Sequence, residues 1–244
     1  MTSLLFSERD TITVVGATGH AGSSFTLLLR KAPYLPAAIS KIVAITHHPL
    51  RSQPNETDRN HLKSIVTDDI AGEIPPNTQI VFSEIRAGQL TDVGGIEDQY
   101  KIGHDLNLNI AKAALDQGVL TFVIVSSSRA SIDSPFAYSR MNAETERDVV
   151  RLGFDRTVIL RPGLIVSHKK DKSALEIQLQ LLLGITKYIP LMGWWVSRKT
   201  CSGREIAKAT LMILKKTAGE KCVLVLSNWD IRKLAREFDI QHEC

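Results

Sequence analysis

Three glycines near the start of the chain have the spacing of a phosphate-binding loop. The segment Gly16 to Gly22 follows a β-branched run, Ile12 to Val15, and precedes an apolar segment of helical character. A strand, a glycine turn and a helix N-terminus together direct backbone N–H groups and the positive end of a helix dipole at an anion. Glycine suits the turn because a side chain would keep a diphosphate away from the backbone, although such glycines can also be purely structural. The stretch predicts a dinucleotide-binding loop. Its candidate cofactor contacts are Gly16, Thr18, Gly19, His20, Ala21 and Gly22.

Apolar runs and helical patterns alternate along most of the chain. Continuous apolar runs such as Lys41 to Thr46 suit strands that are buried on both faces of a parallel sheet. Strands are predicted at residues 12–15, 41–46, 62–66, 79–82, 121–125, 156–160 and 221–226. Helices are predicted from the glycine loop to residue 31 and at residues 100–117, 136–152, 173–183, 202–215 and 230–238. The alternation predicts an α/β fold with a doubly wound, mostly parallel sheet of the Rossmann type.

Length and composition limit the class of protein. The chain has 244 residues, which suits a single domain in which residues 165–244 contribute a small substrate-side lobe. Its net charge of +4 is scattered, which argues against a nucleic-acid surface. The three cysteines are far apart, so we expect neither a metal site nor a disulfide framework. No apolar run reaches the roughly 18 residues of a membrane span. Two early acids, Glu8 and Asp10, argue against a transit peptide.

The loops that follow the predicted strands hold the other candidate contacts. In an open parallel sheet, ligands bind beyond the carboxyl ends of the strands, where the strand order reverses. The loop after the second strand normally decides dinucleotide selectivity, and here it contains His47 and His48. These histidines indicate neither NAD nor NADP and could equally form a polar turn. After the third strand, Asp68 or Asp69 is a candidate acceptor for the adenine amino group, the equal alternative being a solvated strand end. Arg86, after the fourth strand, is a candidate ribose contact.

The G-x-x-G-x-x-G spacing resembles the extended and atypical short-chain dehydrogenases/reductases. In those enzymes a serine after the fifth strand and a tyrosine on the next helix act on a substrate carbonyl, and a lysine four residues later assists the tyrosine. The resemblance assigns these roles to Ser127 and Tyr138 and places Asn142 at the lysine position. It also implies that Pro162 and Gly163 frame the nicotinamide end.

The replacement of the lysine has a physical consequence. A phenol ionises near pH 10, and a nearby cation favours the ionised form, which asparagine cannot do. Arg129 and Arg140 are candidate substitutes, although Arg140 lies two positions from Tyr138 and therefore points elsewhere on a helix. We therefore expect weak or altered activity, and a purely structural role for Tyr138 stays open.

Longer segments resemble the FMP52 family of fungal proteins, which is itself similar to the Tat-interacting-protein-like group of atypical short-chain dehydrogenases. The resemblance implies NAD or NADP as cofactor and peripheral attachment to the mitochondrial outer membrane. Relatives carry lysine at the position of Asn142, and many carry arginines at His47 and His48. If the attachment holds, Trp194 and Trp195 could form an interfacial anchor, the alternative being packing into the C-terminal lobe. The segments that carry the likeness are 16–19, 94–109, 125–127, 136–138 and 158–163.

These features together predict an NAD(P)-binding, short-chain dehydrogenase-like protein with weak or altered oxidoreductase activity on an unidentified carbonyl or alcohol. The alternative is a non-catalytic scaffold or redox-sensing module that binds the dinucleotide without turning it over. A peripheral membrane contact and an oligomer are compatible with the chain, and a cytoplasmic location is the alternative to the mitochondrial one. We expect no nucleic-acid partner.

Overall fold

A parallel sheet forms the centre of the molecule. The computed structural model describes residues 11–31, 40–50, 61–86, 95–166 and 200–242. Among these residues, seven strands form one parallel sheet in the order β3-β2-β1-β4-β5-β6-β9. The chain extends from β1 first to one side and then to the other, which confirms the predicted doubly wound arrangement. The strands are β1 (Thr11–Val15), β2 (Lys41–Thr46), β3 (His61–Val66), β4 (Thr78–Ser83), β5 (Thr121–Val125), β6 (Arg156–Arg161) and β9 (Cys222–Ser227).

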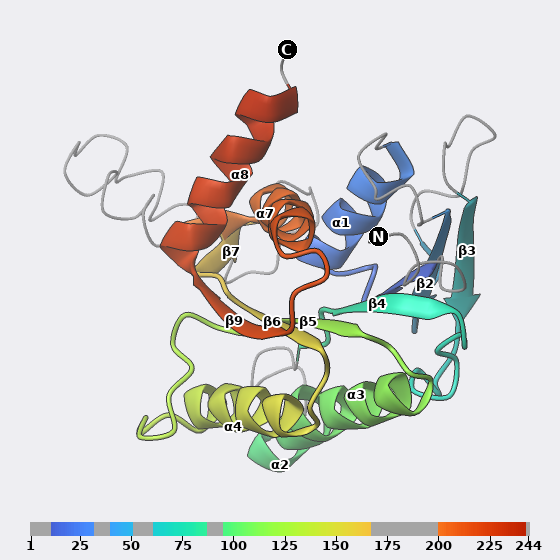
Figure 1. The fold of residues 1–244 in the computed structure, drawn as a ribbon. Helices are drawn as coiled ribbons and strands as arrows, with labels where there is room; N and C mark the ends of the chain where they lie inside the picture. Colours follow the sequence, from blue (N-terminus) through green and yellow to red (C-terminus); the bar gives the residue numbers. More distant parts are fainter. Residues whose placement is uncertain (1–10, 32–39, 51–60, 87–94, 167–199, 243–244) are drawn as a thin grey trace.

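Helices cover both faces of this sheet (Figure 1). On one face lie α1 (His20–Lys31), α7 (Gly203–Lys216) and α8 (Asn228–His242), with α7 between the other two. The opposite face is covered by α2 (Ile96–Tyr100), α3 (Leu106–Asp116) and α4 (Ala137–Arg151). Because helices lie on both faces, β1, β4 and β5 are buried along their whole length.

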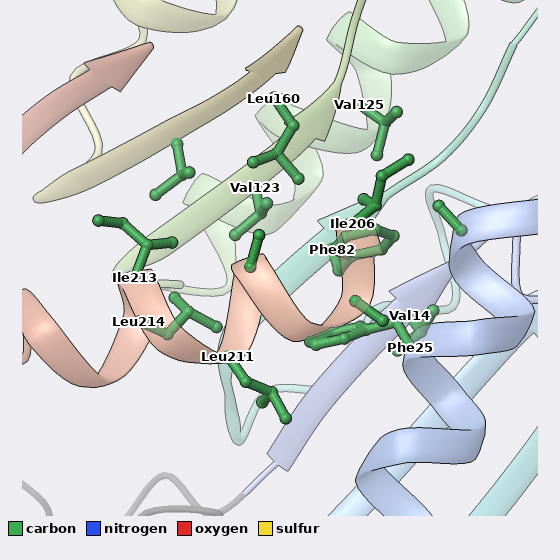
Figure 2. Close-up of a cluster of buried hydrophobic side chains, with 14 of the residues drawn as sticks. Val14, Phe25, Phe82, Val123, Val125, Leu160, Ile206, Leu211, Ile213 and Leu214 are labelled. Atoms are coloured by element: carbon green, nitrogen blue, oxygen red, sulfur yellow. The ribbon is translucent and has the colours of Figure 1, made fainter. Parts of the chain in front are cut away.

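The core under α7 holds the glycine loop in place. Buried side chains of the strands, α1 and α7 interlock there, as Figure 2 shows. Phe25 of α1 packs against Phe82 of β4 with their ring centroids 4.6 Å apart, and both rings are fully buried. Ile206 of α7 belongs to the same cluster. Since α1 is the helix that the glycine loop opens, this packing fixes the loop relative to the end of β4.

The predicted helix at residues 100–117 begins earlier and is not uniform. It starts as α2 at Ile96, passes through a π-helical turn, η1 (Lys101–Asp105), and continues as α3. Gly118, at φ +69°, ends it as expected. The π turn inserts an extra residue into the helical repeat, so side chains beyond it lie on a different face from the one that a regular helix would give. Within α3 itself the regular period holds, and Asn107 lies on the same buried face as Ile110 and Ala114.

The C-terminal third contains short elements that the sequence pattern did not predict. β7 (Leu164–Val166) and β8 (Thr200–Ser202) pair in parallel, but three residues are too few to show a period. α8 runs from Asn228 to His242, beyond the predicted limits of 230–238. The predicted helix at 173–183, together with Trp194 and Trp195, lies outside the described residues.

Candidate functional site

The glycine loop follows β1 and lies beside the end of β4, at the point where the strand order of the sheet reverses. The loop is bonded to both neighbouring strands, since Gly16 N donates to Ile45 O at 3.1 Å and Glu84 N donates to Val15 O at 3.0 Å. Gly16 has φ +79°, and a Cβ there would lie less than 3.0 Å from the Glu84 carbonyl oxygen. A Cβ on Gly22 would collide with the Gly16 carbonyl oxygen in the same way. These two glycines are therefore required by close approach of backbone to backbone.

Glu84, the residue directly after β4, places its carboxylate at the N-terminus of α1. The carboxylate accepts hydrogen bonds from Ala21 N, at 3.0 Å, and from Gly22 N. The residue is only 7% exposed. A Cβ on Gly19 would lie 2.5 Å from the Glu84 Oε2 atom, so the carboxylate lies directly against the loop.

These contacts test whether the loop suits a dinucleotide. Backbone N–H groups at a helix N-terminus are the donors that hold a diphosphate in nucleotide-binding folds. The Glu84 carboxylate stands in for such an anion, because it accepts two of these donors. The donors therefore fit an anion such as a phosphate group, and in this structure two of them bind the Glu84 carboxylate.

The other predicted contacts of the loop differ in exposure. Thr18 is exposed at the loop tip, and Ala21 is buried. The carbonyl oxygen of His20 accepts a hydrogen bond from the Ser24 hydroxyl at 2.8 Å. A Cβ on Gly203, at the start of α7, would lie less than 3.0 Å from that same carbonyl oxygen. The loop is thus packed against the start of α7.

The ends of β2 and β3 carry exposed polar groups. His47 Nδ1 lies 3.6 Å from the Asp68 carboxylate, and both side chains are largely exposed. Asp69 caps a local turn by accepting a hydrogen bond from Gly72 N at 3.1 Å. Both predicted contacts, His47 and Asp69, lie at the carboxyl edge of the sheet, as the topology requires. Their role toward a cofactor stays a prediction.

Tyr138, Asn142 and Arg86 meet at a second part of the same edge. Arg86 Nη2 donates to the Tyr138 hydroxyl oxygen at 3.3 Å, so the cation nearest to this phenol among the described contacts comes from the segment after β4. The Asn142 amide donates to the Tyr138 carbonyl oxygen at 2.7 Å, within α4. Arg140 instead donates to Ser134 O, as its helical position predicts.

A small hollow separates these groups from the strands. Tyr138, Asn142 and Arg86 line it together with Ser126 and Asn107. Its volume of about 10 Å³ is close to what a single water molecule occupies. Several polar side chains therefore converge on a space that holds about one small group.

Asn107 is a site residue that sequence reasoning missed. Its amide donates to Ile85 O at 3.0 Å and to Gly103 O at 2.9 Å, and its oxygen accepts from the Ser83 hydroxyl at 2.9 Å. It is 2% exposed, and its partners come from β4, the segment after it and the π turn. Asn107 therefore fixes the segment that carries Arg86 to the helical face of the hollow. A polar residue within an otherwise apolar helix stripe was the available signal.

A buried ionic network lies next to the hollow and contacts it through Ser126, one of the lining residues. Glu146 of α4 is 4% exposed, and its carboxylate accepts three hydrogen bonds from the guanidinium of Arg161 at the end of β6. The Ser126 hydroxyl donates to the same carboxylate. Hydrogen bonding to Glu146 raises the pKa of Arg161. Ser127, the predicted catalytic serine, lies outside the residues that line the hollow, and its hydroxyl accepts from Arg129 N at 3.3 Å.

A second ionic group joins α4 to the π turn. His104 contacts Asp105 at 2.8 Å and Asp148 of α4 at 3.2 Å. Burial works against the charged imidazole, but hydrogen bonds to both carboxylates raise the pKa of His104 overall. Hydrogen bonding to Arg147, with a smaller contribution from His104, lowers the pKa of Asp148 to about 2. The group holds together two walls of the hollow.

The segment after β6 also lies at this edge. Ser128 N donates to Pro162 O at 2.9 Å, and Gly163 N donates to the side-chain oxygen of Asn228 at 2.7 Å. Pro162 and Gly163 are thus held between the β5 loop and the start of α8. Their predicted position beside a nicotinamide stays a prediction.

The described part of the chain shows neither a metal cluster nor a membrane-spanning helix. No group of three histidine, cysteine, aspartate or glutamate side chains gathers there as a metal site. None of the helices that the structure describes is both long and apolar enough to cross a membrane.

Comparison with known proteins gives relatives by sequence. No protein-family model matches the chain. It is 34% identical over 231 residues to "Protein fmp52-1, mitochondrial" of Aspergillus oryzae, covering 90% of this chain and 95% of the relative. It is 31% identical over 239 residues to "Protein FMP52, mitochondrial" of Saccharomyces cerevisiae, covering 93% and 96%.

Solved structures share the fold at low sequence identity. A UDP-galactose 4-epimerase matches with a TM-score of 0.61 at 18% identity, over 89% of this chain and 76% of that one. MoeE5 in complex with UDP-glucuronic acid and NAD matches with a TM-score of 0.60 at 15% identity, over 89% and 75%. These likenesses confirm the predicted Rossmann-type fold class.

Proposed function

The chain belongs to the FMP52 family of mitochondrial proteins, and from this premise we propose that it is an NAD(P)-binding, short-chain dehydrogenase-like oxidoreductase that acts on a small carbonyl or alcohol. One observation carries the proposal: the Tyr138 hydroxyl accepts a hydrogen bond from a cation, Arg86, at the edge of the sheet that also carries the glycine loop. The fold of the NAD-bound neighbours and the helix N-terminal donors of the loop support a dinucleotide as the cofactor.

The residues of the hollow can supply the acid–base part of the reaction. A bound nicotinamide would supply or accept the hydride. Tyr138 donates its phenolic proton to the carbonyl oxygen as that oxygen gains charge, and it takes a proton back in the reverse direction. Arg86 stabilises the negative charge that develops on the phenol oxygen. Asn142 cannot stabilise this charge, because its side chain is neutral.

Asn142 has a different task in this scheme. Its amide is already bonded to the Tyr138 carbonyl oxygen, so it holds the helix turn that carries the phenol. Asn107 fixes the backbone that precedes Arg86. The two asparagines therefore position the acid and its cation relative to each other.

The cofactor and the chemistry are tested in sequence. A thermal-shift titration with NAD, NADH, NADP and NADPH should raise the melting temperature with at least one of them, because a ligand that binds only the folded state stabilises it. With that cofactor, a panel of small carbonyls should support oxidation of the reduced form. No shift with any of the four would contradict the proposal.

Substitutions then test the assignment of the residues. Tyr138→Phe should lower the rate by about a hundredfold or more, because general acid catalysis is lost. Arg86→Gln should lower it about tenfold, and Asn142→Lys should raise it about tenfold by returning a cation to the neighbouring helix turn. Tyr100→Phe is the control, since the Tyr100 hydroxyl bonds to Glu144 and does not line the hollow. Equal rates in all four variants would show that Tyr138 takes no part in the reaction.

A non-catalytic module is the second candidate. The hollow has room for about one water molecule, and a carboxylate of the chain already occupies the donors of the loop. The small volume of the hollow suits a protein that binds a dinucleotide without turnover. Cofactor-dependent stabilisation with no oxidation on any carbonyl would favour this reading.

Peripheral attachment to the mitochondrial outer membrane is a further part of the proposal. The names of the relatives support the mitochondrion. Alkaline carbonate should release the protein from isolated mitochondria, and protease added outside intact organelles should degrade it. Protection from that protease would contradict the outer-membrane location.

A further inference from the structure

We propose that Glu84 is an internal occupant of the diphosphate position, so that a dinucleotide binds only when this carboxylate leaves the glycine loop. The inference rests on the proposed dinucleotide binding and adds a residue that sets its strength. It concerns the segment from Glu84 to Arg86, which joins the glycine loop to the hollow at Tyr138.

The geometry places the carboxylate on the donors themselves. Glu84 accepts from the backbone N–H groups of Ala21 and Gly22, in the first turn of α1. A diphosphate bound at this helix N-terminus would need donors of the same turn. Two anions cannot share them, because each N–H group points at one position and like charges at contact distance repel.

The side chain of Glu84 lies directly against the glycine loop. The Glu84 Oε2 atom lies 2.5 Å from the position that a Cβ on Gly19 would take. The carboxylate therefore uses the space that a glycine leaves open above the turn. With the carboxylate at the loop, the absence of a side chain at Gly19 makes room for Glu84. At Gly16 and Gly22 it makes room for backbone atoms.

The side chain of Glu84 is the part of the residue that can rotate without moving a strand. Its backbone N is bonded to Val15 O, and its carbonyl oxygen lies against Gly16, so the backbone is fixed by β1. Rotation of the side chain would therefore expose the N–H groups of Ala21 and Gly22 without moving the backbone. Displacement of Glu84 leaves the packing of β1, β4 and α1 in place.

This arrangement predicts a weakened apparent affinity. Hydrogen bonds from N–H groups to a carboxylate are charge-assisted and stronger than neutral ones, and the helix dipole adds to them. A dinucleotide must replace these bonds before it gains its own. The apparent dissociation constant is the intrinsic constant divided by the fraction of molecules in which the carboxylate has left.

The test compares binding in three variants by isothermal calorimetry. The ligands are the dinucleotide that gives the largest thermal shift and ADP-ribose, which carries the diphosphate without the nicotinamide. Glu84→Gln keeps the size of the side chain and removes its charge, while Glu84→Ala removes the occupant. Glu73→Gln, at an exposed acid away from the loop, is the matched control. We expect the dissociation constants to fall at least tenfold in Glu84→Ala, less in Glu84→Gln, and not at all in Glu73→Gln.

The unliganded protein gives a second expectation. Both Glu84 variants should melt at a lower temperature than the wild type without ligand, because the first turn of α1 loses an acceptor. Dissociation constants that stay unchanged or rise in both Glu84 variants would overturn the inference while leaving dinucleotide binding intact. Absence of binding in the wild type and in every variant would overturn the proposed function and the inference with it.

A measurement on the wild type covers the case in which the Glu84 variants fail to fold. The carboxyl carbon of Glu84 should show a large shift of its nuclear magnetic resonance signal when the protein is saturated with ADP-ribose. An unchanged signal at saturation would show that the carboxylate keeps its place, which contradicts the inference.

Discussion

The two ends of the candidate site are built by different kinds of contact. At the glycine-loop end, β1, β4 and α1 approach so closely that a Cβ on Gly16 or Gly22 would strike backbone atoms. At the Tyr138 end, side chains from α4, the π turn and the segment after β4 meet through hydrogen bonds and ion pairs. The first end is therefore fixed by backbone packing, and the second by polar groups.

This difference explains why the two ends tolerate change unequally. A backbone atom cannot move aside without moving a strand, so Gly16 and Gly22 accept no side chain. A polar group can be supplied from a different element, as Arg86 brings a cation to Tyr138 although position 142 is an asparagine. We therefore expect substitutions at the loop to act on stability, and substitutions at the hollow to act on charge and rate.

The largest effect should come from Gly22→Ala. The added methyl group would lie less than 3.0 Å from the Gly16 carbonyl oxygen, and neither atom belongs to a flexible side chain. We expect the free energy of unfolding to fall by about 3 kcal/mol or more, the upper end of what overpacking costs. Urea denaturation followed by circular dichroism measures it.

Gly72→Ala is the matched control for that substitution. Its methyl group would meet only the carboxylate of Asp69, which is the free end of an exposed side chain. We expect a loss of about 0.5 to 1 kcal/mol. Equal losses in the two variants would show that the loop is no more rigid than an ordinary turn, and the comparison would fail.

A smaller effect is expected from Glu146→Ala in the network below the hollow. The substitution leaves the Arg161 guanidinium and the Ser126 hydroxyl without their shared acceptor. Removing one partner of a buried pair costs about 3–5 kcal/mol, and because the Arg161 side chain is 35% exposed we expect about 2 kcal/mol. The double variant Glu146→Ala/Arg161→Ala should lose less than the sum of the single variants. Full additivity in this cycle would disprove the pairing.

The smallest effect should depend on pH. The lowered pKa of Asp148 stabilises the fold fully above its ordinary value of 3.8, and this contribution is lost as the pH falls towards about 2. The raised pKa of His104 contributes below its ordinary value of 6.5, and that contribution is lost as the pH rises through the raised value. The link between α4 and the π turn is therefore strongest between about pH 4 and pH 6.5.

Asp148→Asn tests this window. After allowance for solvent screening of the exposed Arg147, we expect a loss of about 1 kcal/mol near pH 5.5. The difference from the wild type should shrink as the pH falls from 4 towards 2, and partly as it rises above 7. Melting temperatures across this range measure it, and a loss that is constant with pH would contradict the assignment.

The strands of the sheet could be predicted from the sequence to within about a residue. Runs such as Thr121 to Val125 are apolar throughout because the sheet is covered on both faces, and this pattern is local. The start of α7 was predictable for a similar reason, since Ser202 and Glu205 form a capping box. Comparison with relatives confirmed the family resemblance, which rested on longer segments.

The polar contacts of the site could not be predicted from local pattern. Glu84 bonds to Ala21 across 63 positions of sequence, and Arg86 bonds to Tyr138 across 52. Such partners are brought together by strand order, which a window of residues does not contain. The π turn adds a further obstacle, because its extra residue shifts the helical register between α2 and α3.

The contact between Gly203 and His20 has a consequence for the order in which parts of the molecule fold during synthesis. α7 seals the apolar face of α1, and its first residue lies against the backbone of the nucleotide loop. During synthesis, roughly 180 residues must therefore follow His20 out of the ribosome before that loop has its final neighbour. Until then the apolar face of α1 that carries Phe25 lacks the cover of α7. The earliest motif in the sequence is thus among the last parts of the molecule to be completed.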